Sequence, residues 1–329
     1  MAVHRKLKNI DNSGFGPNSN VEGGRLTNKD GSTNLTKTGM PFWARISLYH
    51  TLLRMSQAKF WLIILLFYTS INLFFATVYY LVGVDKLMGI STEGSEAMHF
   101  LNAFFFSSQT LTTVGYGHVA PNSISTSAIA SIESFVGILA FALVTGMLYG
   151  RFTRPRAYLL FSPNTLVAPF RGGRALMLRM ATYKNNHLTD AEVLITMAIH
   201  INENGKDVTR FYPLELEYSK VNSLALSWTV VHPINEQSPI YGYSEQEIHD
   251  SRLELIVAVK AFDDHFSNTV QQRTSYHVSE LIYGARFLPM FRRSENGSNT
   301  ILELDKINLH EKVGLPEPEL VVADSEAMA

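Results

Sequence analysis

Hydrophobic positions are distributed very unevenly along the chain. Residues 60–84 contain no charged side chain, and residues 124–150 contain only one, Glu133. At a helical rise of about 1.5 Å per residue, either segment is long enough to cross a hydrocarbon core of roughly 30 Å. Two buried helices of a soluble core are the alternative, but such helices are seldom this long and this uncharged. The pattern predicts two membrane-spanning helices, residues 60–84 and 124–152.

A third apolar run, residues 97–112, is too short to cross and leads into the sequence TVGYG at residues 113–117. Irregular backbone at membrane depth is tolerated only where protein surrounds it or where it lines a water-filled cavity, so this loop predicts a pore built with other subunits. Glycines lack a Cβ and let successive carbonyl groups turn the same way toward an axis. Rings of such carbonyls replace the hydration shell of K⁺ in potassium channels. The expected K⁺ filter consists of Thr113, Val114, Gly115, Tyr116 and Gly117, whereas an ordinary turn is the plainer alternative.

Basic residues flank the two predicted spans on one side. Residues 41–58 alternate apolar with polar positions and predict a helix lying along the membrane surface. The loop between the spans offers only Lys86, so both termini are expected in the cytoplasm, with the protein in the cell's inner membrane. Anionic lipid headgroups would bind the same basic belt, although orientation alone also explains it. The belt comprises Arg45, Arg54, Lys59, Arg151, Arg154 and Arg156.

The remaining segments have other patterns. Residues 1–40 are rich in Asn, Gly, Ser and Thr without an apolar period, which predicts a flexible tail. Between residues 157 and 310 the period changes to two, which predicts a cytoplasmic β-sandwich followed by a tail over residues 311–329. The expected strands include residues 175–181, 192–201, 214–218, 223–231 and 254–262.

Composition excludes several classes of function. The chain has no cysteine, which rules out disulfides, thiolate metal sites and a cysteine nucleophile. Its 28 basic and 29 acidic residues give no sign of a nucleic-acid partner. Common catalytic and phosphate-binding motifs are absent from the sequence, which argues against an enzyme. A β domain with a simple membrane anchor is a further rival.

Several motifs together resemble one family. TVGYG between two spans, YHTLLRMS before the first, RFTRPRA after the second, and the later SPIYG and QQRTSY are similar to the inwardly rectifying potassium channels, especially the bacterial (KirBac-type) members. The resemblance covers residues 42–310. It implies a homotetramer whose immunoglobulin-like cytoplasmic domains extend the pore, and a potassium-selective channel of the inward-rectifier type. A non-selective or ligand-gated cation channel with a regulatory domain is the alternative.

The resemblance also suggests roles for single residues. Phe141 takes the cavity position where strong rectifiers carry an acid, with Thr145 on the same pore-lining stripe. Tyr149 matches the constriction near the cytoplasmic exit and is the candidate gate, with Phe152 second, although packing against the first span is the plainer explanation. Because Phe141 carries no charge, Mg²⁺ or polyamines are expected to block only weakly.

Four acidic residues have alternative explanations. Asp190 and Asp264 match the cation sites of the cytoplasmic pore, but free-standing acids are more often a solvated face. The sequence Asp263-Asp264-His265 imitates a metal site without a second ligand group. Glu133 either faces the cavity or braces the pore helix, with Thr110 or Thr112 as its expected partner. The family's usual ion pair behind the filter is absent, since Gln109 and Val119 occupy those positions.

Overall fold

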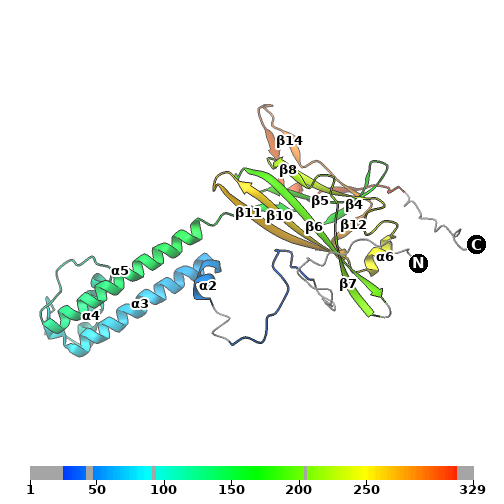
Figure 1. The fold of residues 1–329 in the computed structure, drawn as a ribbon. Helices are drawn as coiled ribbons and strands as arrows, with labels where there is room; N and C mark the ends of the chain where they lie inside the picture. Colours follow the sequence, from blue (N-terminus) through cyan, green and yellow to red (C-terminus); the bar gives the residue numbers. More distant parts are fainter. Residues whose placement is uncertain (1–24, 42–46, 91–93, 204–205, 317–329) are drawn as a thin grey trace, which may run out of the picture. The chain divides into compact units, whose positions relative to one another are not determined.

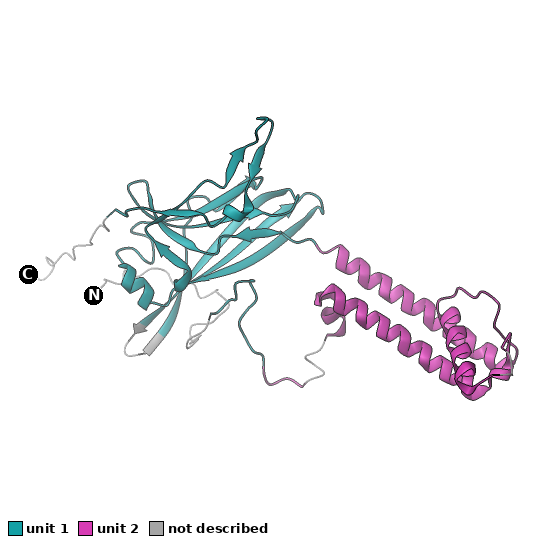
Figure 2. Cartoon of the chain, turned by 180° about the vertical axis from the view of Figure 1, so that it is seen from behind, with its two compact units in different colours: residues 1–37, 155–329 teal, residues 38–154 magenta. Residues whose placement is uncertain are grey.

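The computed structural model describes residues 25–41, 47–90, 94–203 and 206–316. Figure 2 colours its two compact units, which are a helical unit, Thr38–Arg154, and a β domain formed by the rest of the described chain.

The helical unit contains two long helices with a shorter one between them (Figure 1). Both long helices are long and apolar enough to cross a membrane. Helix α5 has the predicted bounds, whereas α3 begins three residues earlier and ends two residues earlier than its predicted span. The elements are α2 Leu48–Arg54, α3 Gln57–Val82, η1 Val84–Lys86, β1 Leu87–Met88, α4 Glu96–Leu111, β2 Ala120–Pro121 and α5 Ile124–Phe152.

Local chemistry explains where these helices begin and end. The hydroxyls of Ser95 and Ser123 accept hydrogen bonds from backbone N–H groups in the first turns of α4 and α5, as N-cap residues do. Helix α3 ends at Val82 and is capped by Gly83, whose φ of 115° is closed to most other residues. Helix α2 begins after Ser47 and is shorter than the predicted surface helix, part of which lies outside the described residues.

Aromatic packing holds α4 beside α3. Tyr79 and Phe106 lie edge to face with ring centroids 5.0 Å apart, and both are buried, as is the neighbouring Phe75. Edge-to-face pairs of this kind contribute about 0.5–1.5 kcal/mol beyond the area they bury. The short helix is therefore fixed against the long one by side chains that the two helices bury together.

The β domain is a sandwich of two five-stranded sheets, which confirms the predicted fold class. One sheet has the order β11-β10-β6-β7 with β8 on β6, and the other has the order β12-β4-β5-β3 with β9 on β5. The strands of the two sheets are β3 Leu159–Phe161, β4 Thr165–Phe170, β5 Gly173–Thr182, β6 Leu188–Glu203, β7 Lys206–Pro213, β8 Lys220–Ser223, β9 Ser227–Ile234, β10 Glu254–Asp263, β11 Asn268–His277 and β12 Leu281–Tyr283.

The core lies between the two sheets. Alternate residues of each sheet point inward, as Leu176 and Leu178 do on β5 and as Leu255 and Val257 do on β10. Smaller elements complete the domain: α6 Glu245–Asp250, η2 Val278–Glu280, β13 Ala285–Phe287, β14 Phe291–Arg293, β15 Thr300–Leu302, η3 Leu304–Lys306 and β16 His310–Lys312. Strand β16 pairs with β13, so the predicted tail over residues 311–329 begins inside the fold.

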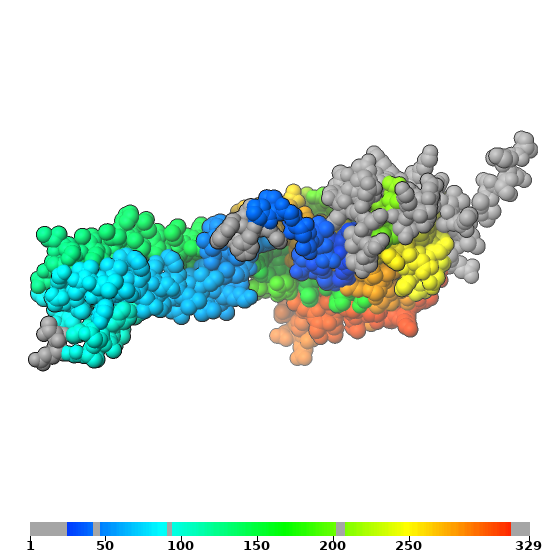
Figure 3. Space-filling view, turned by 90° about the horizontal axis from the view of Figure 1, so that it is seen from below, coloured from blue at the N-terminus to red at the C-terminus, as the bar shows by residue number. Residues whose placement is uncertain are grey.

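Part of the predicted N-terminal tail also belongs to the β domain (Figure 3, dark blue). Leu26 is buried against Ala198 and Phe211. The Glu254 carboxylate accepts hydrogen bonds from the backbone N–H groups of Leu26, at 2.8 Å, and Thr27, at 3.0 Å. The expectation of a flexible tail over residues 1–40 is therefore wrong for this stretch, because one buried leucine and a carboxylate distant in sequence hold it.

Candidate functional site

The loop after α4 has an alternating backbone. The angle φ is positive at Thr113 (59°), Gly115 (52°) and Gly117 (79°), and it is not positive at Val114 or Tyr116 between them. In a strand successive carbonyls point to opposite sides, whereas alternation of the sign of φ can turn them to the same side. Nothing lies within 4 Å of a Cβ built on either glycine, so these positions are glycine for backbone reasons and not for lack of space.

The loop directly follows the C-terminal end of helix α4, and backbone hydrogen bonds to α4 fix its first residues. The backbone N–H groups of Val114 and Gly115 donate to the Gln109 carbonyl at 3.0 and 3.3 Å, and the Thr113 N–H donates to the Thr110 carbonyl at 3.1 Å. The C-terminal end of a helix carries a partial negative charge of about half an elementary charge. The end of α4 therefore favours a cation beside the loop.

A buried polar cluster joins α3, α4 and α5 behind the loop. The Glu133 carboxylate of α5 accepts from the Tyr79 hydroxyl of α3 at 2.7 Å and from the Ser107 hydroxyl of α4 at 2.5 Å. Asn72 of α3 lies 3.2 Å from the Ser107 hydroxyl. All four side chains are buried. The arrangement places Glu133 as a brace between helices.

The partners of Glu133 differ from the sequence expectation. The hydroxyls of Thr110 and Thr112 donate to carbonyls of their own helix, those of Phe106 and Ser108. Tyr79 and Ser107 take their place. The signal that could have found them is the presence of polar side chains inside otherwise apolar segments, because such groups are seldom buried without a partner.

Helices α4 and α5 approach most closely where α4 ends. A Cβ built on Gly137 would lie 1.9 Å from the carbonyl oxygen of Leu111, the last residue of α4. Only glycine fits at such a distance, so Gly137 is a further residue that the sequence did not reveal. It sets the depth of the loop relative to α5.

The predicted pore-lining residues lie along α5 and are uncovered in the single chain. Phe141 is 76% exposed, and Tyr149 and Phe152 are exposed to 71% and 69%. Thr145 is exposed as well. Aromatic side chains left open on a membrane helix have to be covered by lipid or by other subunits. The structure places these four residues on one helix, α5.

The basic belt divides into two kinds of residue. The Arg151 guanidinium donates to the carbonyls of Leu52 at 2.6 Å and Met55 at 2.9 Å, and it lies 4.5 Å from the centre of the Phe60 ring. It thereby joins the end of α2 to the end of α5. In contrast, the other described members of the belt are exposed: Arg54, Lys59, Arg154 and Arg156. Arg45 lies outside the described residues.

The two predicted cation sites of the β domain are paired with basic groups. Lys220 Nζ lies 2.7 Å from the Asp190 carboxylate, and His187 Nδ1 lies 2.8 Å from that of Asp264. Asp263 accepts from the backbone N–H of His265 at 3.0 Å, as an Asx turn does. Asp263-Asp264-His265 lies at a turn, and among the described residues there is no group of three or more His, Cys, Asp or Glu side chains that could hold a metal ion.

Comparisons with known proteins match both units of the chain. The family model for the inward rectifier potassium channel C-terminal domain matches residues 159–328, and an ion channel model matches residues 65–154. The inward rectifier potassium channel Kirbac3.1 of Paramagnetospirillum magnetotacticum is 33% identical over 286 residues, which cover 86% of this chain and 95% of the relative.

Animal proteins match at lower identity. The inward rectifier potassium channel irk-1 of Caenorhabditis elegans is 26% identical over 84% of this chain and 55% of its own length. The human G protein-activated inward rectifier potassium channel 2 is 25% identical over 93% of this chain and 76% of its own length. The similarity therefore spans both the helices and the β domain.

Proposed function

Because the chain belongs to the inward rectifier potassium channel family, we propose that residues 113–117 form the selectivity filter of a homotetramer. The protein is a membrane potassium channel of the inward-rectifier type and not an enzyme. In this proposal K⁺ passes through rings of backbone oxygens from Thr113, Val114, Gly115 and Tyr116. The alternating sign of φ at the end of α4 is the observation that carries the assignment.

The gate is proposed near the end of α5. Tyr149, with Phe152 one turn further, would close the pore on its cytoplasmic side, and Phe141 with Thr145 would line the cavity above. All four side chains are exposed in the single chain, but so are Phe135 and Leu143 of the same helix, so the assignment rests on the family resemblance. Both termini and the β domain lie in the cytoplasm of the cell in this arrangement, following the positive-inside rule.

Anionic lipid is proposed to act on this gate through the exposed members of the basic belt. Each positive charge near an anionic membrane surface contributes about 1 kcal/mol of attraction. Arg54, Lys59, Arg154 and Arg156 are exposed and would bind headgroups. Arg45, which lies outside the described residues, is included from the sequence alone. Arg151 would instead pass the movement of α2 on to α5, because its donors already bind α2 carbonyls.

Rectification by Mg²⁺ or polyamines is proposed to be weak. Phe141 offers a multivalent cation no charge in the cavity, and Asp190 and Asp264 are paired with Lys220 and His187. In addition, dissolved salt at physiological concentration screens the attraction of an exposed charge for a cation more than about 8 Å away. Steep voltage-dependent block of the unmodified channel by spermine would contradict this proposal.

Cation flux into liposomes tests the proposed function. Reconstituted protein should take up K⁺ and its analogue Rb⁺ but exclude Na⁺, and Ba²⁺ should block the uptake. Equal uptake of Na⁺ and K⁺ would favour the non-selective cation channel instead. Failure of all uptake, with the protein shown to be inserted, would argue against an open pore.

A further inference from the structure

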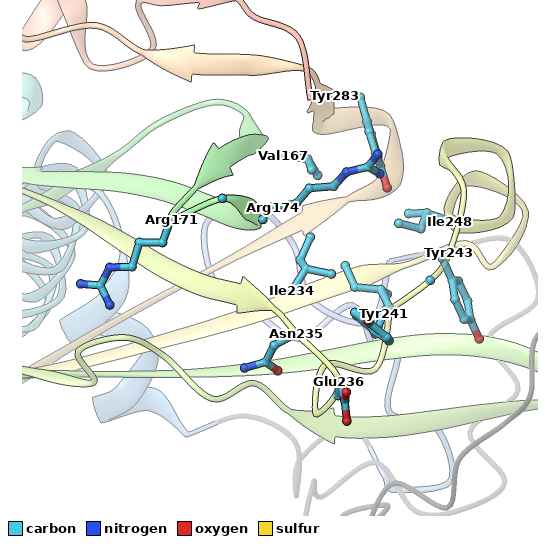
Figure 4. Close-up of a pocket in the computed structure, with 14 residues that line it drawn as sticks. Val167, Arg171, Arg174, Ile234, Asn235, Glu236, Tyr241, Tyr243, Ile248 and Tyr283 are labelled. Atoms are coloured by element: carbon cyan, nitrogen blue, oxygen red, sulfur yellow. The ribbon is translucent and has the colours of Figure 1, made fainter. Parts of the chain in front are cut away.

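The β domain contains a cavity of about 430 Å³ that the conduction pathway does not use (Figure 4). It lies between the turn joining β4 to β5, the end of β9 with the loop that follows, helix α6, and Tyr283 at the end of β12. Its volume is within the range of about 300–1,000 Å³ that is typical of ligand pockets. Nothing in the channel's proposed mechanism explains its presence.

The walls of this cavity combine apolar and cationic groups. Ile240 and Ile248 form buried apolar wall, and Tyr243 is partly buried beside them. Figure 4 shows the Arg174 side chain reaching to the Tyr283 ring. Burial raises the pKa of Tyr283 to about 12 even though Arg174 opposes the shift, so the phenol keeps its proton. The cavity thus offers an apolar surface with a guanidinium at its edge.

The chain itself leads to this cavity. Strand β16 pairs with β13, and the Val313 N–H then donates to the Gly284 carbonyl at 2.8 Å. Leu315 packs against the core of the sandwich. The Arg174 Nε donates to the Pro316 carbonyl at 2.7 Å. The described chain therefore ends at Pro316, held by a side chain that lines the cavity.

The sequence after Pro316 is complementary to the cavity. Residues 317–329 read EPELVVADSEAMA, with the apolar run Leu320-Val321-Val322 and no basic residue. Their four acids are Glu317, Glu319, Asp324 and Glu326. Four residues of extended chain span at most about 13 Å. They start at the Pro316 carbonyl, which already lies at Arg174, a lining residue of the cavity.

We propose that residues 317–322 dock in this cavity of their own chain, with Leu320, Val321 and Val322 against its apolar walls and the first two acids beside Arg171 and Arg174. Among the lining side chains the two guanidinium groups outnumber the single carboxylate, that of Glu236. Arg171 already pairs with Glu217 at the rim and is mostly exposed, so Arg174 is the main anchor. The proposal does not depend on K⁺ conduction.

Disulfide trapping tests the contact directly, because the native chain has no cysteine. A disulfide forms only when the two Cα atoms come within about 7 Å. Val321→Cys combined with Tyr243→Cys should form a disulfide within one chain after mild oxidation of the full-length protein in detergent, as read by peptide mass spectrometry. The matched control, Val321→Cys with Arg293→Cys on β14, should not. No bond, a yield equal to the control, or a bond between two chains would overturn the proposal.

Hydrogen exchange gives a second test without cysteines. Deleting residues 317–329 should speed backbone exchange in the loop around Tyr241 and Tyr243, and adding a synthetic peptide of residues 317–329 should slow it again. Val321→Asp should imitate the deletion, whereas Met328→Asp, six residues beyond the docked run, should not. If exchange in this loop is unchanged by the deletion, something other than the tail covers the cavity and the proposal is wrong.

Discussion

At the residue scale, Glu133 of α5 is the group that connects α3 and α4 behind the proposed filter. Glu133→Ala would leave the buried Tyr79 hydroxyl without an acceptor, which costs about 1–3 kcal/mol. We therefore expect a lower temperature of thermal unfolding in detergent and reduced selectivity for K⁺ over Na⁺. Glu133→Gln keeps an acceptor oxygen and should lose less.

Ser131→Ala is the matched control for this change. Ser131 lies on the same helix, is exposed, and its hydroxyl donates only to the Ser127 carbonyl. If Glu133→Ala is no more harmful than Ser131→Ala, then Glu133 does not brace the pore helix, and a role at the cavity would replace the present assignment.

A buried histidine makes the β domain sensitive to pH. His232 Nδ1–H donates to the Glu215 carbonyl at 2.6 Å, and Nε2 accepts from the Ser238 hydroxyl at 2.8 Å. Burial lowers the pKa of His232 below its ordinary value of 6.5. The folded state therefore holds the ring neutral, and its contribution to stability is present above pH 6.5 and lost as the pH falls from there through the folded-state pKa.

The pH dependence of stability due to His232 cannot exceed that of one bound proton. Below the pKa of free histidine, the free energy of opening of β9 should fall by up to about 1.4 kcal/mol per pH unit. Hydrogen exchange of the β9 amides, corrected for the intrinsic effect of pH, measures it. The variant His232→Gln should lose most of this pH dependence. An identical pH dependence in both proteins would show that another group is responsible.

The sequence was informative for some residues of the site and not for others. Glu133 could be singled out because a lone charge in an apolar segment has a reason to be there. Its partners could not, since the hydroxyls of Thr110 and Thr112 have the right chemistry but bind carbonyls of their own helix. Which of several nearby polar groups meets a carboxylate depends on helix rotation, which composition does not encode.

At the scale of elements, the close contact between α4 and α5 is possible because Gly137 has no side chain. Gly137→Ala would place a Cβ 1.9 Å from the Leu111 carbonyl oxygen, so the end of α4 would have to move. We expect lower thermal stability and a loss of K⁺ conduction in liposomes. Gly146→Ala on the same helix, where no atom lies within 4 Å of the added Cβ, should be tolerated. Similar losses in both variants would mean that alanine is not tolerated at glycine positions of α5 in general, and that the Gly137 contact has no special role.

The link between α2 and α5 can be separated from lipid binding. Arg151→Gln removes the bonds to the Leu52 and Met55 carbonyls and should change flux at every lipid composition. Arg154→Gln changes an exposed side chain and should lower only the response to anionic lipid. Flux measured across a series of anionic lipid contents checks both expectations. If the two variants behave alike, Arg151 has no separate mechanical role.

The accuracy of the predicted elements follows from the strength of their patterns. The two long helices lie close to their predicted bounds because charge-free segments of this length have few alternatives. The strand predicted over residues 214–218 is wrong, as the chain there crosses between sheets: Leu214 N–H donates to Ile195 of one sheet and Glu217 N–H to Val231 of the other. Strand β11, Asn268–His277, was missed because its sequence is largely polar.

At the scale of the whole molecule, the proposed filter requires other subunits. Tyr116 is 79% exposed in the single chain, and the carbonyls of one loop cannot surround an ion. The need for other subunits could be predicted from the sequence, because irregular backbone next to membrane-spanning helices must be covered by protein or line a water-filled cavity. The number of subunits came from family resemblance alone, since no pattern within one chain encodes a fourfold axis.

The reversal potential of reconstituted channels, with K⁺ on one side of the membrane and Na⁺ on the other, tests the central claim most directly. A filter of backbone oxygens should give a potential close to that of a K⁺-selective membrane. Gly115→Ala should shift it toward zero, because an added Cβ opposes the positive φ of 52° at that position. A potential near zero for the unmodified channel, or full selectivity in Gly115→Ala, would contradict the account.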